Sequence, residues 1–486
     1  MLRAKPTTLT ATTSSYYRAI VLKARYAVRP RQKREPSEYE GIPPELWHHV
    51  FSFLKDDKLD LTSLTRVSKS FAALAQPLLF QHIVIRPLCS QHPTSGRLTC
   101  RVDCVERVTE RMRFGTQERI AHAVTTIEFS PTINYARRDS SNAEVAAVAD
   151  MVIRMLPLFP RLRSFRCAHL ILQPHHLDTI SGIANIRSFH ATNCHMSDNF
   201  HDHIHESPME EFTMAWQGNT SDLLGATLSP HSHQRWCSFT HPDHLRTLNL
   251  APLDAFLDRM LADIVDRNMQ FHALRSLSLP WMAVQSDSFV PLLERTPFLQ
   301  ELRFTVRPSH RTIAMARPLP RHVLRNLSVL EAPDSALPFL LSSKSIQELS
   351  CSAVRDGGSP PTDIIAVFDA LPPGSLWELE RLSLDMKCLS DELWDCLVRT
   401  TPHVTTLSVD IRGMAWGPTA GSLGSHTTEV WLDPFHSGMR ELMPTRFPPS
   451  VEHCGLFPVA SAPRYTGVLV RRETICDSHT PCRSSI

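Results

Sequence analysis

The chain lacks the long apolar stretches of membrane proteins and the leader of secreted ones. None of its 486 residues lies in a run of 18 consecutive apolar side chains, so the sequence predicts no membrane-spanning helix. The N-terminus has no apolar segment of the kind found in secretory signals, and the twelve cysteines follow no even framework of close spacings. Reduced thiols and a cytoplasmic or nuclear location are therefore expected.

The sequence also lacks the motifs of common catalytic sites. It contains no G-x-x-x-x-G-K-[ST], no G-x-G-x-x-G, no G-x-S-x-G and no H-E-x-x-H. Only 16 glycines are available for loops that cradle phosphates. We therefore predict a non-catalytic chain without catalytic residues or cofactor.

Histidine, by contrast, is abundant, with 25 residues. Two stretches carry possible metal ligands: "FHATNCHMSDNFHDHIHE", with its histidines from His190 to His205, and "CSQHPTSGRLTCRVDC" from Cys89 to Cys104. Within the second, the gaps from Cys89 to His92 and from Cys100 to Cys104 match those of paired zinc ligands. One such match in a histidine-rich chain favours solvated loop side chains, so no metal site is predicted. A metal-dependent enzyme with an unrecognised site stays a minor alternative.

Acidic residues are missing from the first 34 positions, which hold nine Lys or Arg. The rest of the chain then has 42 basic and 49 acidic residues, a net charge of −7. Such a body is poorly suited to nucleic acid, which requires a concentrated basic patch. The arm, residues 1–40, is predicted to be disordered; its composition also resembles a mitochondrial transit peptide, the alternative for this segment.

What the chain does have, directly after the arm, is the apolar segment "IPPELWHHVFSFL" from Ile42 to Leu54. Pro44 and Glu45 suit the first turn of a helix. On a helical projection, six large side chains (Leu46, Trp47, Val50, Phe51, Phe53 and Leu54) cover about 160° of the circumference, wider than the ~100° that one core contact needs. A second surface is expected to cover the remainder.

The next segment, "DLTSLTRVSKSFAALAQPLLF", predicts a helix that begins at an Asp60 cap and continues to Phe80. Its apolar residues recur at steps of three and four, at Leu61, Leu64, Val67, Phe71 and Leu74. About forty residues with so many large apolar groups form a helical hairpin or trio that cannot bury them all alone. A partner surface is therefore implied.

Further along, a pattern of the form apolar-x-x-apolar-x-apolar recurs eleven times. It starts at Val124, Leu162, Ile186, Met209, Leu245, Leu274, Leu299, Leu327, Ile346, Leu379 and Val404. The starts differ by 19 to 38 residues, the period of a leucine-rich repeat with one short strand per unit. Candidate helices lie between the strands, such as "NAEVAAVADMVIRMLPLF", "LDAFLDRMLADIVDR", "PTDIIAVFDAL" and "SDELWDCLVRT".

Each of these units exposes an apolar edge that only the next unit can bury, which predicts a stacked α/β array. A set of unrelated αβ units is the alternative. The Asn or Cys expected three positions after the last apolar residue occurs only at Cys194, so the sequence leaves the curvature open. After residue 412 the pattern fades, with a capping unit expected near "VEHCGLF" and no role assigned to the tail.

The segment from Ile42 to Phe80 resembles the F-box. The match follows the order of that motif: Ile42–Pro43, Glu45, "VFSFL", Asp60–Leu61, "RVSK", Phe71 and "PLLF". This chain has Phe71 and Phe80 where the family commonly has tryptophan, and Ile42 where it has leucine. With the repeats, the chain resembles a fungal-type F-box protein with degenerate leucine-rich repeats. The fold class expected is α/β, a small all-α F-box helical module followed by an irregular leucine-rich-repeat solenoid (horseshoe).

The resemblance implies a substrate-recognition adaptor of a cullin-RING ubiquitin ligase, in which the module docks a Skp-type linker. The matching positions that would face the linker or support that face are Ile42, Pro43, Leu46, Val50, Phe51, Leu54, Leu61, Leu64, Val67, Lys69 and Phe71. Direct contact is expected above all from Pro43, Phe51 and Lys69. The predicted domains are the arm at 1–40, the F-box at 41–85, a connector at 86–120, the solenoid at 121–460 and a tail at 461–486. A non-degradative F-box scaffold is the main alternative.

A target protein is expected on the concave face of the solenoid. Because side chains alternate along a strand, the third and fifth positions of each repeat point away from the apolar interior. The candidates on that face are Arg166, His190, Asn249, Glu301, Arg303, Glu348 and Arg381. Their mixed charges suit a protein segment, and we expect neither nucleic acid nor a membrane as partner.

Overall fold

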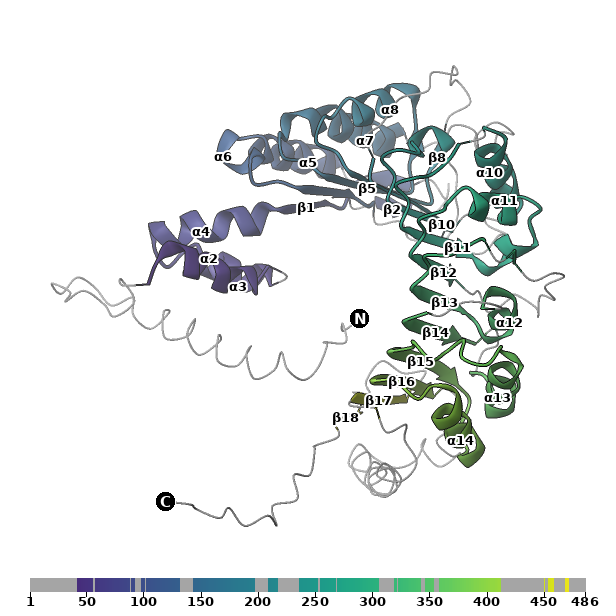
Figure 1. The fold of residues 1–486 in the computed structure, drawn as a ribbon. Coiled ribbons are helices and arrows are strands. Elements are labelled where there is room, and N and C mark those ends of the chain that lie inside the picture. Colours follow the sequence, from purple (N-terminus) through teal and green to yellow (C-terminus); the bar gives the residue numbers. More distant parts are fainter. Residues whose placement is uncertain are drawn as a thin grey trace, which may run out of the picture. The chain divides into compact units, whose positions relative to one another are not determined.

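The computed structural model describes residues 42–55, 57–87, 89–91, 98–100, 102–131, 143–196, 209–216, 236–251, 254–267, 269–305, 319–320, 322–341, 346–353, 358–411, 450, 453–458 and 468–471 (Figure 1). The predictions for the N-terminal arm and for most of the region after residue 411 lie outside these residues. The described residues fall into two compact units, which lie within Lys5–Leu274 and Arg275–Ile486. We describe them separately as the N-terminal and C-terminal units. No helix within the described residues is long and apolar enough to cross a membrane.

The N-terminal unit begins with a module of three short helices. They are α2 (Pro44–Ser52), α3 (Lys58–Leu64) and α4 (Lys69–Phe80). Pro44 and Glu45 occupy the first turn of α2, as predicted. The single helix predicted after Asp60 is wrong, because the chain breaks at residues 65–68 into α3 and α4. The cap of α3 is Asp57, whose Oδ1 accepts from the backbone N–H groups of Leu59 and Asp60 at 3.2 and 3.1 Å.

The core of this helical module is small. Its buried side chains are Phe51, Leu61, Leu64 and Ala75, and partly buried apolar groups such as Trp47 and Phe71 pack against them. Trp47, Phe51 and Phe71 form an aromatic cluster with ring centroids 4.9 to 5.8 Å apart. Ser68 caps α4 by accepting from the Phe71 N–H at 3.1 Å, which fixes the point where Phe71 enters the core.

Six parallel strands follow within the described residues of the N-terminal unit. In spatial order they are β1 (His82–Ile85), β4 (Thr126–Phe129), β5 (Ser164–Ala168), β7 (Ser188–Thr192), β9 (Glu211–Ala215) and β10 (Thr247–Ala251). Two separate short sheets pair β2 (Cys89–Gln91) with β3 (Leu98–Cys100) and β6 (Ile171–Leu172) with β8 (His195–Met196). The helical segments are α5 (Val102–Gly115), α6 (Glu118–Ala121), α7 (Ala143–Met155), η1 (Leu156–Leu158), α8 (Pro174–Ser181), η3 (Cys237–Phe239) and α10 (Asp254–Asp266).

In its described part, the C-terminal unit repeats the arrangement with seven parallel strands and one antiparallel strand. In spatial order they are β11 (Ser276–Pro280), β12 (Glu301–Thr305), β13 (Val329–Pro333), β14 (Glu348–Ser352), β15 (Arg381–Met386), β16 (Thr406–Ile411), β17 (His453–Pro458) and the antiparallel β18 (Val468–Arg471). The helical segments are η4 (Trp281–Gln285), α11 (Phe289–Glu294), η5 (Asp334–Ala336), α12 (Leu337–Leu340), α13 (Pro361–Ala370) and α14 (Asp391–Thr400). In Figure 1, α12, α13 and α14 lie on one side of these strands.

All eleven predicted repeat motifs form strands of these two units, and the four predicted helices are α7, α10, α13 and α14. The fourth and sixth positions of the motif point inward and stack in rows across the strands. In the N-terminal unit one row runs through Phe165, Phe189 and Phe212, whose rings stack at 6.1 and 6.2 Å between centroids. The fold class is therefore α/β, a helical module followed by a leucine-rich-repeat-type array. β17 coincides with the expected capping position, whereas β1 was not predicted.

Candidate functional site

The helical module presents an apolar surface to its surroundings. Ile42, Leu46, Phe53 and Leu59 are 37%, 56%, 61% and 81% exposed. Pro43, next to Ile42 in sequence, and Lys69 are also exposed. Leu46 and Phe53 are seven residues apart, two helical turns, and therefore lie on one side of α2. We call the exposed set Ile42, Pro43, Leu46, Phe53 and Leu59 the docking face. Of this set, Leu46 and Phe53 belong to the six-residue apolar arc that the sequence predicts for the opening helix.

Three predicted linker-binding residues lie inside the module instead. Phe51 is 1% exposed, and Leu61 and Leu64 are also buried. The direct contact expected from Phe51 conflicts with this burial, because its ring packs on Phe71 at 5.2 Å, edge to face. A helical projection gives the width of an apolar arc but not the part of it that meets the core. In this module, α4 packs against the side of α2 that carries Trp47 and Phe51.

The remaining predicted residues lie between these extremes. Val50, Leu54 and Phe71 pack partly against the core, and Val67 is half-buried. The sequence prediction of linker-binding residues left out Phe53, although it belongs to the predicted arc, and Leu59, because "KDDKLD" was expected to be a turn. A helix starting at Lys58 after an Asp57 cap, with Leu59 in its first turn, is the signal that was missed.

The predicted target-binding residues of the N-terminal unit lie on the strand face that points away from the buried rows. Arg166 and His190 are direct neighbours across β5 and β7, and His190, Thr213 and Asn249 continue the same row through β9 and β10. His190 does not extend freely, because its Nε2 lies 2.7 Å from the Ser188 hydroxyl and 3.5 Å from Glu211. The hydrogen bond from His190 lowers the pKa of the Glu211 carboxyl.

In the C-terminal unit the predicted residues pair with each other. Glu301, Glu348 and Arg381 lie in one row of residues that are paired across neighbouring strands. Arg303, two residues after Glu301 on β12, lies in the next row on the same face. Arg303 Nη2 lies 3.3 Å from Glu301 Oε2, and Arg381 Nε donates to Glu348 Oε2 at 3.0 Å. These exposed charges largely neutralise one another, so the strand face offers mixed polar contacts rather than a field of one sign.

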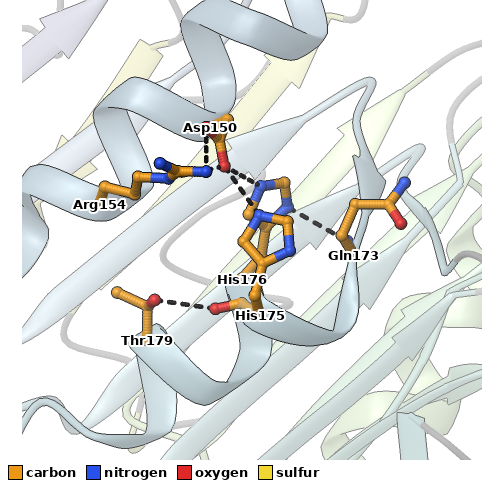
Figure 2. A network of polar contacts seen from close by, with 6 residues as sticks. All are labelled: Asp150, Arg154, Gln173, His175, His176 and Thr179. Atoms are coloured by element: carbon orange, nitrogen blue, oxygen red, sulfur yellow. Dashed lines mark hydrogen bonds and ion pairs between the residues drawn. The ribbon is translucent and has the colours of Figure 1, made fainter.

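A further polar cluster joins two helices of the N-terminal unit (Figure 2). Asp150 of α7 faces His175 and His176 of α8, whose Nε2 atoms lie 2.7 and 3.3 Å from its Oδ1. Arg154 adds an ion pair at 3.0 Å. Burial alone would raise the pKa of Asp150, but the hydrogen bonds from both histidines lower it overall. Sequence analysis missed this cluster because its two parts lie 25 residues apart.

Asp150, His175 and His176 have their potential ligand atoms within 4.8 Å of one another, which raises the question of a metal. The backbone N–H of Gln173 donates to His176 Nδ1 at 3.1 Å. The neutral ring therefore carries its proton on Nε2, the atom that faces Asp150, and a ring in that state has no lone pair there for a cation. Histidine ligands ordinarily donate their second ring N–H, the reverse of this arrangement. The cluster fits a tie between α7 and α8 better than a metal site.

The two stretches with possible zinc ligands lie partly outside the described residues. In the first, residues 197–208 fall there, while His190 contacts Ser188 and His195 packs edge to face on Trp216. In the second, residues 92–97 fall there, and Cys89 and Cys100 are partners in the β2–β3 register. Cys194 is the one match to the Asn or Cys expected three positions after the last apolar residue of a repeat. It is buried, and its Sγ lies 3.7 Å from that of Cys167.

Comparison with known families matches residues 39–86 to the F-box-like family, so the chain contains an F-box-like domain over the helical module. The match covers about a tenth of the chain, and the predicted fungal type stays a prediction. A search of curated proteins found no match.

Among solved structures, the chain is similar to the leucine-rich repeat-containing protein LegL7 from Legionella pneumophila, with 14% identity and a TM-score of 0.27, over 76% of this chain and 90% of that one. It is also similar to the TLR13–ssRNA13 complex, with 11% identity and a TM-score of 0.25, over 60% of this chain and 36% of that one. At these values nothing about ligands or partners passes to this chain.

Proposed function

We propose that the chain is a substrate-recognition adaptor of a cullin-RING ubiquitin ligase, in which the docking face binds a Skp-type linker. The observation that carries the proposal is the apolar docking face on a segment that matches the F-box-like family. Burying such a face against a partner gains about 25 cal/mol for each Å² of apolar surface. Lys69, exposed at the start of α4, is the charged residue among the predicted linker-binding positions.

The strand array supplies the second half of the proposal, the binding of a target protein. The polar strand face carries Arg166, His190 and Asn249 in one unit and the pairs Glu301–Arg303 and Glu348–Arg381 in the other. Ubiquitin-transfer chemistry belongs to other subunits in such an assembly, so the chain needs no catalytic group of its own. The adaptor would act in the cytoplasm or nucleus.

The test is a pull-down of the full chain with purified Skp-type linker and cullin. We expect Leu46→Asp with Phe53→Asp to abolish linker binding, because a carboxylate in an apolar contact costs on the order of several kcal/mol unless it is paired. Trp377→Asp is the matched control, since Trp377 is a similarly exposed aromatic side chain at 59% but lies outside the F-box-like segment. It should bind linker like the wild type.

Unchanged linker binding by the well-folded double variant would remove the support for a docking face. The same preparation separates the adaptor from a non-degradative scaffold. An adaptor should promote ubiquitination of a co-purified target when the complete ligase is supplied, whereas a scaffold binds the linker without that product.

A further inference from the structure

Lysine is unevenly distributed along the chain. The sequence has 43 arginines but only 8 lysines, at Lys5, Lys23, Lys33, Lys55, Lys58, Lys69, Lys344 and Lys387. Residues 70–343 contain 26 arginines and no lysine. A ratio of 8 lysines to 51 basic residues would place about four lysines among those 26 positions. This stretch is therefore depleted in lysine beyond the composition of the whole chain.

The fold explains only some of these arginines. Arg154 contacts Asp150 through Nε at 3.1 Å and Nη2 at 3.0 Å, a forked contact that a lysine amine cannot reproduce. In contrast, Arg119 of α6, Arg259 of α10 and Arg325 before β13 are exposed, and their guanidinium groups contact no carboxylate among the described residues. Lysine at these three positions would keep both the charge and the long apolar stem.

The remaining difference between the two side chains is their reactivity toward acyl groups. A deprotonated lysine amine attacks the carbonyl carbon of a thioester, so that a C–N bond forms, the C–S bond breaks and the thiolate leaves. Ubiquitin is transferred from such a thioester on a carrier enzyme. The guanidinium group of arginine stays protonated at physiological pH and is not an acceptor. The stretch 70–343 therefore offers no side-chain amine to ubiquitin.

The lysines that the chain retains lie outside the strands from β1 to β13. In the helical module, Lys69 is a predicted linker-binding residue, and Lys58 Nζ donates to the carbonyl oxygen of His82 at 3.0 Å. Among the described residues after Lys69 there is one lysine, Lys387, which is exposed. Most of the array can thus hold a partner without presenting an amine of its own.

We propose that the lysine-free stretch keeps ubiquitin off the array, so that a target bound to the strand face accepts the ubiquitin instead. The proposal rests on the proposed function, because only a subunit of an active ligase is held beside a ubiquitin thioester. A target and the array that binds it are exposed to the same thioester, so any lysine of the array would compete with those of the target. A non-degradative scaffold has no such competition to avoid.

The experiment reconstitutes the ligase from the full chain, Skp-type linker, cullin–RING complex, activating and conjugating enzymes, ubiquitin and ATP. The triple variant Arg119→Lys, Arg259→Lys and Arg325→Lys raises the number of lysines after Lys69 from two to five. At equal reactivity, the ubiquitin that peptide mass spectrometry finds after Lys69 should rise about 2.5-fold. The matched control carries glutamine at the same three positions, adds no amine and should resemble the wild type.

Introduced lysines that stay unmodified, while other lysines of the chain or of a co-purified target take ubiquitin, would overturn the proposal. A glutamine variant that gains as much ubiquitin as the lysine variant would also overturn it, because the effect would then come from the lost arginines. Linker binding is measured in parallel on every variant. Its absence from all of them, wild type included, would reject the proposed function together with this inference. Linker binding with unmodified introduced lysines would reject this inference alone.

Discussion

The helical module and the strand array differ in how many of their large apolar side chains are exposed. Of the eleven large apolar side chains that are exposed within the described residues, four lie between residues 42 and 59. In the strands, by contrast, nearly every inward-pointing side chain is buried and belongs to a row across the strands. The module therefore has too little core for its apolar groups, whereas the array shows mainly polar groups on its strand face. A partner that binds by burying apolar surface belongs at the module, and one chosen by polar contacts belongs at the array.

The largest expected effect is on the buried row of the array. Phe212 lies among Phe189, Trp236 and Phe239, with centroids 5.7 to 6.2 Å away. Phe212→Ala should lower the free energy of unfolding of the N-terminal unit by about 3–5 kcal/mol, because it leaves a cavity in a rigid stack. Urea denaturation followed by tryptophan fluorescence measures this. Thr213→Ala, the next residue but on the opposite strand face, is the control. A loss below ~1 kcal/mol for Phe212→Ala would show that the row is not a packed core.

The next prediction compares two phenylalanines two residues apart in the module. Phe51→Ala should destabilise the module by about 3 kcal/mol and abolish amide-exchange protection in α2, α3 and α4, while the strands stay protected. Phe53→Ala, on the docking face, should change stability by no more than ~0.5 kcal/mol but weaken linker binding. Hydrogen exchange by mass spectrometry and the pull-down separate the two effects. Equal loss of protection in both variants would contradict the division into core and docking face.

This pair also shows how far sequence reasoning extends. The eleven strands were predictable because each repeat gives the same spacing of inward residues. In contrast, β1 was missed because "HIVI" directly follows a helix and lacks the apolar residue with which the repeat motif begins. Phe51 was wrongly expected to contact the linker, because periodicity gives the width of an apolar arc but not which neighbouring surface each part of the arc contacts. Asp150 and His176 come together only through the packing of α7 on α8, and no local spacing encodes that. Arg163, Arg187 and Arg246, which directly precede β5, β7 and β10, did have a local signal, because each holds the second position of the motif in "LRSFRC", "IRSFHA" and "LRTLNL".

A smaller effect concerns pH and the tie between α7 and α8. Burial lowers the pKa of His176, and protonating Nδ1 would break its bond to the Gln173 N–H. The unfolded chain binds this proton more readily, so stability should fall as pH drops below the unfolded histidine value of about 6.5. Asp150, with a lowered pKa, adds stability that is lost only as pH falls below its unfolded value of about 3.8. The groups that face His176 are Asp150, His175 and Arg154.

The measurement is urea denaturation of the wild type and His176→Asn between pH 7 and 5. Asparagine offers an oxygen near the Nδ1 position but does not titrate in this range, so the variant should lose less stability on acidification. The expected difference is at most ~1.4 kcal/mol per pH unit for one proton. His244→Asn, at an exposed histidine of the same unit, is the control and should follow the wild type. Parallel pH curves for wild type and His176→Asn would contradict a role for this ring.

The smallest expected effect compares the strand faces of the two units. Arg381 is paired with Glu348, whereas Arg166 is exposed and forms no ion pair among the described residues. Arg381→Gln should cost up to ~1 kcal/mol, less at high salt, since exposed ion pairs contribute little and are screened. Arg166→Gln should change stability by no more than ~0.5 kcal/mol. Denaturation at 50 and 500 mM salt tests both, and a salt-dependent loss for Arg166→Gln would mean that the faces do not differ in this way. Because neither change should disturb the fold, a target that binds the array through these faces should lose affinity in one or both variants while linker binding at the module persists.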